Sequence, residues 1–236
     1  MGDVPAETHF GTSDFGSLMA EVARELTAQG DVKQTVQRVV DLAAEHLDRQ
    51  IVASVSLVRG RGRVDTPASS DPRAARADAL QYETGQGPCL DAIWEQETFE
   101  IKDMGTERRY PAWTERVLTE TGIRSSLSYQ LFTSGDSLGA LNLYGLQPHA
   151  FDDDDRADGL LFAAHAAVAL QAAVSDENLR SALAFRLVIG QAQGILMERH
   201  RISAQMAFDL LRRLSQRSNV KLRVVAQQVV DGRTTV

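Results

Sequence analysis

The longest pattern of apolar positions lies in residues 155–199. This stretch contains no proline, and it contains no glycine between Leu160 and Ile189. Its apolar residues recur mostly three or four positions apart, the spacing that places side chains on one face of an α-helix. They are Leu160, Leu161, Ala164, Ala167, Val168, Leu179, Leu183, Leu187, Ile195 and Leu196. The pattern predicts one long helix, and two shorter helices with an N-cap at Ser175 and Asp176 are the alternative.

A helix through these 45 residues would be about 65 Å long at 1.5 Å per residue, more than one small domain can cover. We therefore expect part of its apolar face to pack against a second copy of the chain. The predicted assembly is a parallel homodimer, and its seam consists of Leu179, Leu183 and Leu187.

The first part of the chain predicts helices followed by strands. Residues 15–47 have helical periodicity, which Gly30 and Asp31 interrupt as a helix end and a new N-cap. Runs rich in β-branched or apolar residues predict strands at 51–58, near Val64, and at 98–102, 123–132 and 137–145. Residues 133–136 predict a hairpin loop between the last two strands. Residues 1–13 are expected to be a flexible N-terminus.

These elements predict an α+β domain in which one antiparallel sheet is flanked by helices. Residues 71–120 give no regular pattern apart from one strand, and we interpret them as a long irregular segment that covers one face of the sheet. In the last strand, alternation places Leu141 and Leu143 on one face and Asn142 and Tyr144 on the other. We expect the leucines to contact helices and the polar pair to face the irregular segment.

Net charge divides the chain into two parts. From Asp176 onward there are ten Arg or Lys and five Asp or Glu, whereas the preceding part carries 15 and 27. The C-terminal part therefore has a net charge of +5 and the rest −12. A basic helical tail on an acidic protein suits a module that attracts phosphate, although a solvated helical surface would show the same charge.

The sequence predicts neither export nor membrane insertion. Its N-terminus is acidic and polar, and no uninterrupted apolar run approaches the roughly 20 residues that span a bilayer. We therefore expect a cytoplasmic protein without a membrane partner. Cys89 is the single cysteine, which excludes an intramolecular disulfide and a cysteine-cluster metal site.

Three ordered segments of the tail resemble the ANTAR domain, the RNA-binding output module of transcription antitermination regulators. They are IGQAQGILMER at 189–199, AFDLLRRLS at 207–215 and NVKLRVVA at 219–226. The resemblance implies a three-helix bundle in residues 174–236, and its implied partner is an RNA stem-loop whose exposed bases can be read by protein.

A second resemblance covers the preceding domain, residues 14–173. YETGQGPCLDAI at 82–93, TFEIKDM at 98–104, RYPAW at 109–113, GIRSSLS at 122–128 and LGALNLY at 138–144 are similar to successive pieces of a GAF domain. The resemblance implies a small-molecule ligand between the sheet and the segment that covers it. The Asn-Lys-Xaa-Xaa-Phe-Asp-Glu signature of cyclic-nucleotide binding is absent, which disfavours that ligand. The sequence identifies no cofactor.

Candidate residues for lining the ligand pocket share polar or aromatic side chains near its expected walls. They are Cys89, Trp94, Trp113, Tyr129, Asn142 and Tyr144. For each of them, membership of an ordinary core is the competing interpretation. Cys89 has no neighbouring His or basic residue to lower its pKa, which favours a small buried side chain over a reactive thiol.

Catalytic and metal-binding patterns are not found. The five histidines are scattered and lack Glu-x-x-His or His-x-x-x-His spacing, and no nucleophile elbow or phosphate-binding loop is present. We expect a protein that is not an enzyme. Residues 152–155 are all Asp, and helix capping explains them better than a metal loop, because a helix N-terminus favours negative charge.

The predicted RNA-binding residues lie in the three tail segments. Ser203 and Asn219 are predicted N-caps, and basic residues in the first turn of the last helix oppose its dipole, which favours an anionic partner. Arginine suits phosphate, and glutamine can reach base edges. The predicted set is Gln191, Gln193, Arg199, Arg212, Arg213, Arg217, Lys221 and Arg223. Gly190 and Gly194 lower helix stability by about 1 kcal/mol each relative to alanine, which suggests close approach of another helix.

The pattern as a whole predicts a ligand-responsive, RNA-binding antitermination regulator that acts on RNA hairpins as a dimer. The main alternative is a signalling adaptor that binds no RNA and whose C-terminal bundle mediates dimerisation and contact with a protein partner. DNA binding is a third possibility, because small helical bundles with arginine are common to both kinds of nucleic-acid-binding protein.

Overall fold

The computed structural model describes residues 12–46, 51–95, 98–133 and 137–233, and it divides into two compact units, Met1–Val174 and Ser175–Val236. Most of the N-terminus that we expected to be flexible lies outside the described residues, as does most of the predicted hairpin loop. Each unit has its own core and is described by itself.

The first unit is built on a five-stranded antiparallel sheet with the order β2-β1-β5-β4-β3. The predicted α+β class with one antiparallel sheet and flanking helices is confirmed. The strands correspond to the sequence pattern, with small shifts at their ends. They are β1 (Ile51–Arg59), β2 (Arg63–Ser69), β3 (Phe99–Ile101), β4 (Ser125–Phe132) and β5 (Ser137–Gly145), and a single 3-10 turn at Gly60–Gly62 joins the first two.

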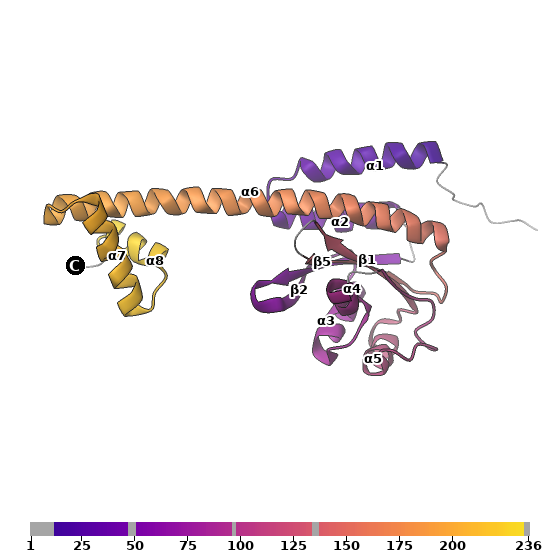
Figure 1. Cartoon of the computed structure of the whole chain (residues 1–236). Helices are drawn as coiled ribbons and strands as arrows, with labels where there is room; N and C mark the ends of the chain where they lie inside the picture. Colours follow the sequence, from indigo (N-terminus) through magenta and orange to yellow (C-terminus); the bar gives the residue numbers. More distant parts are fainter. Residues whose placement is uncertain (1–11, 47–50, 96–97, 134–136, 234–236) are drawn as a thin grey trace, which may run out of the picture. The chain divides into compact units, whose positions relative to one another are not determined.

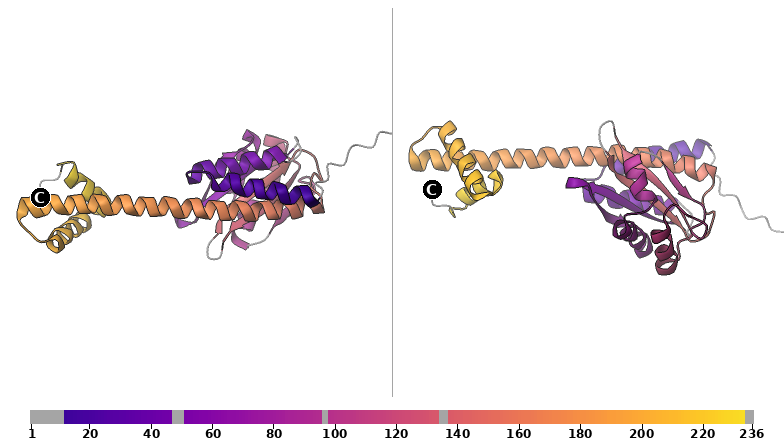
Figure 2. Two further views of the ribbon diagram at one scale, coloured as in Figure 1. Left: turned by 90° about the horizontal axis from the view of Figure 1, so that it is seen from above. Right: turned by 60° about the horizontal axis from the view of Figure 1, so that its bottom comes forward.

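One face of the sheet is covered by α2 (Val32–His46) and the first part of α6 (Asp153–His200), and α1 (Thr12–Thr27) packs on the outer side of these helices, as Figures 1 and 2 show. The break between α1 and α2 occurs where the sequence predicted it, because Asp31 Oδ1 accepts a hydrogen bond from Gln34 N at 2.8 Å. The sheet contributes alternate apolar residues to this core, including Leu141 and Leu143, as predicted.

The opposite face is covered by three helices, so the expectation of an irregular segment at residues 71–120 is wrong. They are α3 (Pro72–Thr84), α4 (Pro88–Glu95) and α5 (Pro111–Thr121), which lie together on this side in Figure 1. Each begins with proline, and α3 has strong end signals: Asp71 caps its first turn and Gly85 ends it with a φ of 67°. The helices are short, and their amphipathic patterns are correspondingly weak.

Helix α6 is continuous from Asp153 to His200, so the alternative with a break at Ser175 is wrong. Its N-terminus is capped by Asp152 Oδ1, which accepts hydrogen bonds from the backbone N of Asp154 at 2.9 Å and of Asp155 at 2.8 Å. The capping interpretation of this acidic run is confirmed.

The face of α6 that packs on the sheet differs from the stripe that the sequence suggested. Phe162, Ala163, Ala166 and Leu170 are buried in the core with the sheet. Of the predicted stripe only Ala167 is buried here, whereas Leu160, Leu161 and Val168 are 52%, 49% and 65% exposed. This segment of α6 has apolar residues on two faces. The periodicity alone does not show which face is buried, because that depends on which one packs against the sheet.

The second unit packs the end of α6 against α7 (Ala204–Ser218) and α8 (Leu222–Val230). Its core contains Ala192, Leu196, Ala207, Leu211, Val225, Ala226 and Val229. Ser203 caps α7 as predicted, through its hydroxyl and the backbone N of Met206 at 3.3 Å. The predicted cap at Asn219 is wrong: Asn219 ends α7 with a φ of 54°, and Lys221 is the N-cap residue of α8, where its side chain makes no capping hydrogen bond.

The mean hydropathy of α6 corrects the expectation that no segment of the chain is apolar enough to span a bilayer. By length and composition alone α6 could cross a membrane, because it contains an 18-residue window with a mean hydropathy of 1.5. The count of uninterrupted apolar runs missed this window, because an average tolerates single polar residues. The core helices of soluble proteins pass the same test, and one face of α6 is buried against the sheet here.

The start of α6 allows a test of this packing. A Cβ added at Gly159 would lie 2.3 Å from the hydroxyl oxygen of Tyr129, whose ring is fully buried. Helix propensity alone predicts that Gly159→Ala stabilises the protein by about 1 kcal/mol. We expect the opposite, a lower melting temperature in thermal unfolding, because α6 must move away from the sheet. An unchanged or raised melting temperature would show that the tyrosine contact is not tight.

Candidate functional site

The sheet face under α3 and α4 carries a buried polar cluster. Helix α3 places Asp78, Gln81 and Tyr82 on one side, because residues three and four apart share a helix face. Alternate residues of β1 and β5 meet them from the sheet, and β2 adds one residue. The sheet residues of the cluster are Ser54, Ser56, Thr66, Asn142 and Tyr144.

Asp78 is the centre of this cluster, and its side chain is fully buried. Its Oδ1 accepts hydrogen bonds from the Tyr144 hydroxyl and, at 3.1 Å, from Asn142 Nδ2. Its Oδ2 accepts from the hydroxyls of Ser54 at 2.7 Å and Thr66 at 2.8 Å. Burial raises the pKa of Asp78 above its usual value, and these hydrogen bonds oppose that shift only in part.

Cys89, at the start of α4, borders the cluster. Its backbone N donates to Gln81 Oε1 at 2.8 Å, and its thiol donates to Ser56 Oγ at 3.2 Å. Burial raises the pKa of the Cys89 thiol to about 12, so the thiolate that would act as a nucleophile is not formed near neutral pH. Its environment is that of a small buried side chain, in a cluster with Ile93 and Ala140.

Four buried polar atoms on the same sheet face have no hydrogen-bond partner among the residues that the structure describes. They are Ser126 Oγ, Ser128 Oγ, Gln130 Oε1 and Asn142 Oδ1. The register pairs Ser126 with Tyr144 and Ser128 with Asn142, so they lie beside the Asp78 cluster. A buried polar atom without a partner costs about 1–3 kcal/mol, so these four oxygens are candidate acceptors for a further hydrogen-bonding group.

The second unit exposes a basic surface. Arg199, Arg213, Arg217, Lys221 and Arg223 are all exposed, and so is Gln191. Arg212 is also exposed but is paired with Asp209 at 3.0 Å. The predicted role of Gln193 is weakened, because its Nε2 donates to the carbonyl of Ala204 at 3.0 Å and holds the turn before α7. The structure thus brings most of the predicted RNA-binding side chains onto the surface of one small bundle.

Comparison with protein families identifies both units. The GAF domain model matches residues 29–171, more than half of the chain, and the ANTAR domain model matches residues 177–230. The chain belongs to the GAF domain family. Its C-terminal unit is an ANTAR domain. GAF domains are ligand-sensing domains and ANTAR domains are RNA-binding domains of antiterminators, and both are sensor or regulatory domains rather than catalytic ones.

Solved structures resemble the GAF unit. A putative GAF sensor protein from Burkholderia vietnamiensis is 15% identical with a TM-score of 0.55, covering 74% of this chain and 99% of that one. The GAF domain of a phosphoenolpyruvate-protein phosphotransferase from Coxiella burnetii is 17% identical with a TM-score of 0.54, covering 70% and 98%. Free methionine-R-sulfoxide reductase from Neisseria meningitidis is 14% identical with a TM-score of 0.50, covering 71% and 97%. These likenesses show the fold alone. No curated protein sequence matches the chain.

The residues that we expected to line the GAF pocket are distributed over several environments. Cys89, Asn142 and Tyr144 belong to the polar cluster or touch it. Trp113 is buried on the same side of the sheet in an apolar core, where its Nε1 donates to the carbonyl of Ala77 at 2.9 Å. Their part in binding a ligand stays a prediction.

Two of the candidates do not line the cluster, one because it points to the other sheet face and one because it is exposed to solvent. Tyr129 is in the core under α2 and α6, and its hydroxyl donates to the carbonyl of Arg156 at 3.2 Å. Strand alternation explains the error, since Tyr129 follows Ser128 and therefore points to the other face. Trp94 is 56% exposed on α4.

The central residues of the cluster were missed by sequence analysis. Asp78, Gln81 and Tyr82 have the i, i+3, i+4 spacing of one helix face, but the segment was not recognised as helical. Ser54 and Ser56 alternate along β1 and could have been assigned to the same face as Asn142, their antiparallel neighbour.

Removing the buried carboxyl tests the cluster. Because the pKa of Asp78 is raised in the folded protein, its contribution to stability is complete below its unfolded pKa and is lost as pH rises through the folded pKa. The stability of the wild type relative to Asp78→Asn should therefore fall as pH rises above about 4. The measurement is denaturant unfolding over a pH series, with Glu115→Gln, at an exposed carboxylate, as control. A pH-independent difference would mean that Asp78 is not held in its protonated form.

Proposed function

We propose that the protein is a cytoplasmic, ligand-responsive antitermination regulator that binds RNA hairpins as a homodimer. The ANTAR match over residues 177–230 carries the proposal, because it falls on a bundle with its own core and an exposed basic surface. The GAF unit supplies the sensor, and α6 runs without interruption from one unit into the other.

The cations of the two units differ in whether they form ion pairs. In the GAF unit, arginines such as Arg38, Arg76 and Arg116 each pair with two carboxylates. In the C-terminal unit, most cations have no ion pair among the described residues. They are Arg186, Arg199, Arg201, Arg213, Arg217, Lys221 and Arg223. Cations without a carboxylate partner are available to phosphate, and this supports an RNA-binding role for the second unit.

The partnerless polar atoms support ligand sensing by the GAF unit. Ser126, Ser128, Gln130 and Asn142 present two hydroxyls and two amide oxygens on the face that carries Asp78. No Lys or Arg is among the cluster's hydrogen-bond partners in the described residues, so an anionic ligand would lack compensation there. The signal that fits this face is small, uncharged and able to donate hydrogen bonds.

Exposed apolar residues on α6 support dimerisation. Leu179, Leu183 and Leu187 are 59%, 56% and 63% exposed. Gly190 and Gly194 follow Leu183 and Leu187 by one heptad and therefore lie on the same helix face. Apart from the adjacent residues and the local backbone of α6, no described atom lies within 4 Å of a Cβ built at either glycine, so no other described helix makes the predicted close approach. A second α6 packed along this face would cover the leucines and explain the glycines.

Charge reversal in the bundle tests the RNA role. The full-length protein should bind RNA hairpins with an affinity that falls as salt rises, because phosphate contacts release counterions. Arg213→Glu or Lys221→Glu should weaken binding and reduce the salt slope by about one, with unchanged helicity. Arg63→Glu, an exposed arginine of the GAF unit, is the control for net charge. Wild-type affinity in both bundle variants would favour the adaptor function instead.

Charge placed in the seam tests the dimer. Leu183→Glu and Leu187→Glu should give folded monomers, since an uncompensated carboxylate is costly in a buried helix interface. Met206→Glu, at a 57% exposed site on α7, is the matched control and should leave the assembly unchanged. Light scattering measures the oligomeric state, and circular dichroism verifies that each variant is folded. A monomeric wild type, with and without RNA, would refute the proposed seam.

A further inference from the structure

The ANTAR unit contains an open groove between α6 and α8 of about 780 Å³. We propose that this groove binds one unpaired base of the RNA, with Phe185 as the surface on which the base stacks. The inference rests on the proposed RNA-binding function and adds a specific base-binding site to it. None of the eight predicted RNA-binding residues except Arg223 lines the groove.

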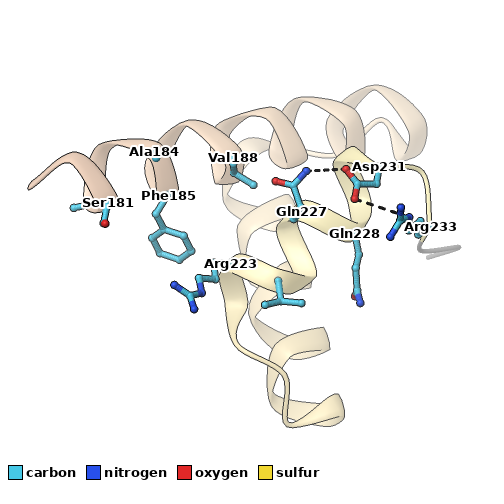
Figure 3. A pocket seen from close by; sticks show the side chains of 11 residues that line it. Ser181, Ala184, Phe185, Val188, Arg223, Gln227, Gln228, Asp231 and Arg233 are labelled. Carbon is cyan, nitrogen blue, oxygen red and sulfur yellow. Dashed lines mark hydrogen bonds and ion pairs between the residues drawn. The ribbon is translucent and has the colours of Figure 1, made fainter. Parts of the chain in front are cut away.

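The groove has an apolar floor and a polar rim. Phe185 and Val188 of α6 and Val224 of α8 form the floor, and Ser181, Ala182 and Ala184 leave space beside the ring. The rim is formed by Arg223, Gln227, Gln228, Asp231 and Arg233, which come from α8 and the residues that follow it; in Figure 3 Gln227 and Asp231 lie toward α6, whereas Gln228 points away from it.

The position of Phe185 explains why its ring remains accessible. Phe185 precedes the core residue Ala192 by seven positions, so both lie on the bundle-facing side of α6. Phe185 nevertheless does not belong to the core cluster, and it is only half-buried. The bundle core therefore continues at this end as an open groove in which an aromatic ring is available to a flat partner.

The chemistry of the groove suits a nucleobase attached to a phosphate backbone. Bases of single-stranded RNA stack on aromatic side chains and on arginine planes, and they hydrogen-bond along their edges. Phe185 provides the ring, and Arg223 projects into the same space from the opposite wall (Figure 3). Gln227 lies toward α6 in Figure 3, and its side-chain oxygen can accept a hydrogen bond from a base edge.

The charge of the rim favours the same partner. Asp231 is its single carboxylate, and it already accepts a hydrogen bond from Gln227 Nε2 at 2.7 Å and faces Arg233 Nε at 4.0 Å. Arg223 has no ion pair among the described residues, so its charge remains available to the RNA. A purely apolar ligand or an apolar peptide helix would leave these rim groups unused.

The groove is compatible with the proposed dimer. Phe185 lies two positions from both Leu183 and Leu187, and two positions correspond to about 200° around a helix. A second copy packed on the leucines therefore covers the other side of α6. Each subunit of the dimer would present one base-binding groove.

The experiment uses the full-length protein and the tightest-binding hairpin selected by the wild type from a pool with randomised loops. Phe185→Ala and Phe185→Leu should each weaken binding about 5- to 150-fold, the effect of losing one stacked base, whereas Phe185→Trp should retain affinity. The Phe185→Leu variant keeps an apolar side chain but has no aromatic ring, so it distinguishes the loss of stacking from the loss of apolar burial. Met206→Ala, an exposed apolar site of the same bundle, should bind like the wild type. Circular dichroism and melting temperature verify that each variant is folded.

Abasic substitution along the loop then identifies the stacked base. One position should weaken binding to the wild type yet have little further effect on Phe185→Ala, because a base and its stacking surface are lost together. Additive effects at every position would overturn the inference.

The other outcomes separate the two proposals. If Phe185→Ala and Phe185→Leu bind like the wild type while Arg213→Glu binds weakly, the groove does not hold a base, and the RNA-binding function stands. If Phe185→Ala changes the oligomeric state without RNA, the groove is an interface between copies, and the inference fails. If the wild type selects no hairpin, the proposed function itself is wrong.

Discussion

Burial of α6 in two separate cores is the constraint on which the rest of the structure depends. Its first part covers the GAF sheet through Phe162, Ala163, Ala166 and Leu170, and its last part forms the ANTAR core through Ala192 and Leu196. Between them the apolar residues Leu179, Leu183 and Leu187 remain more than half exposed among the described residues. In the proposed dimer, such a helix would carry a signal between the units, since a change at one end would alter how two copies of the exposed apolar middle pair.

The GAF unit uses its two sheet faces for different purposes. One face holds an apolar core under α1, α2 and α6, and the other combines an apolar core with the Asp78 cluster. Buried polar groups whose hydrogen bonds are all made favour one packing of the core, because any other packing leaves some of these groups without a hydrogen-bond partner. The four partnerless atoms of β4 and β5 lie at the border of that cluster. A ligand that satisfied them would strengthen contacts among the sheet, α3 and α4.

The ANTAR unit combines two kinds of contact that RNA recognition requires. In the proposed function, exposed cations such as Arg213 and Lys221 would attract phosphate without reading sequence. The groove beside Phe185 offers a site for a single base, and base contacts are what specify a sequence. The proposed dimer would set the distance between two such sites, and that distance would select RNAs that present two unpaired bases in matching positions.

The sequence by itself determined those helices, strands and helix caps whose sequence patterns involve only neighbouring residues. The 3.6-residue period of α6, the β-branched run of β1, and the Asp31 and Ser203 caps were each readable from neighbouring residues, and ordered motifs identified both domains. Only the tertiary structure decided what depends on residues far apart in the chain. Leu160, Leu161 and Val168 are as apolar as the residues that α6 buries, and the sheet chose between the two faces. Asp78 became a functional candidate only when α3 placed it against Ser54 and Tyr144, and Phe185 only when α8 formed the opposite wall of its groove. Local patterns are set by periodicity and capping within a few residues, whereas burial and groove formation are set by which distant surfaces meet.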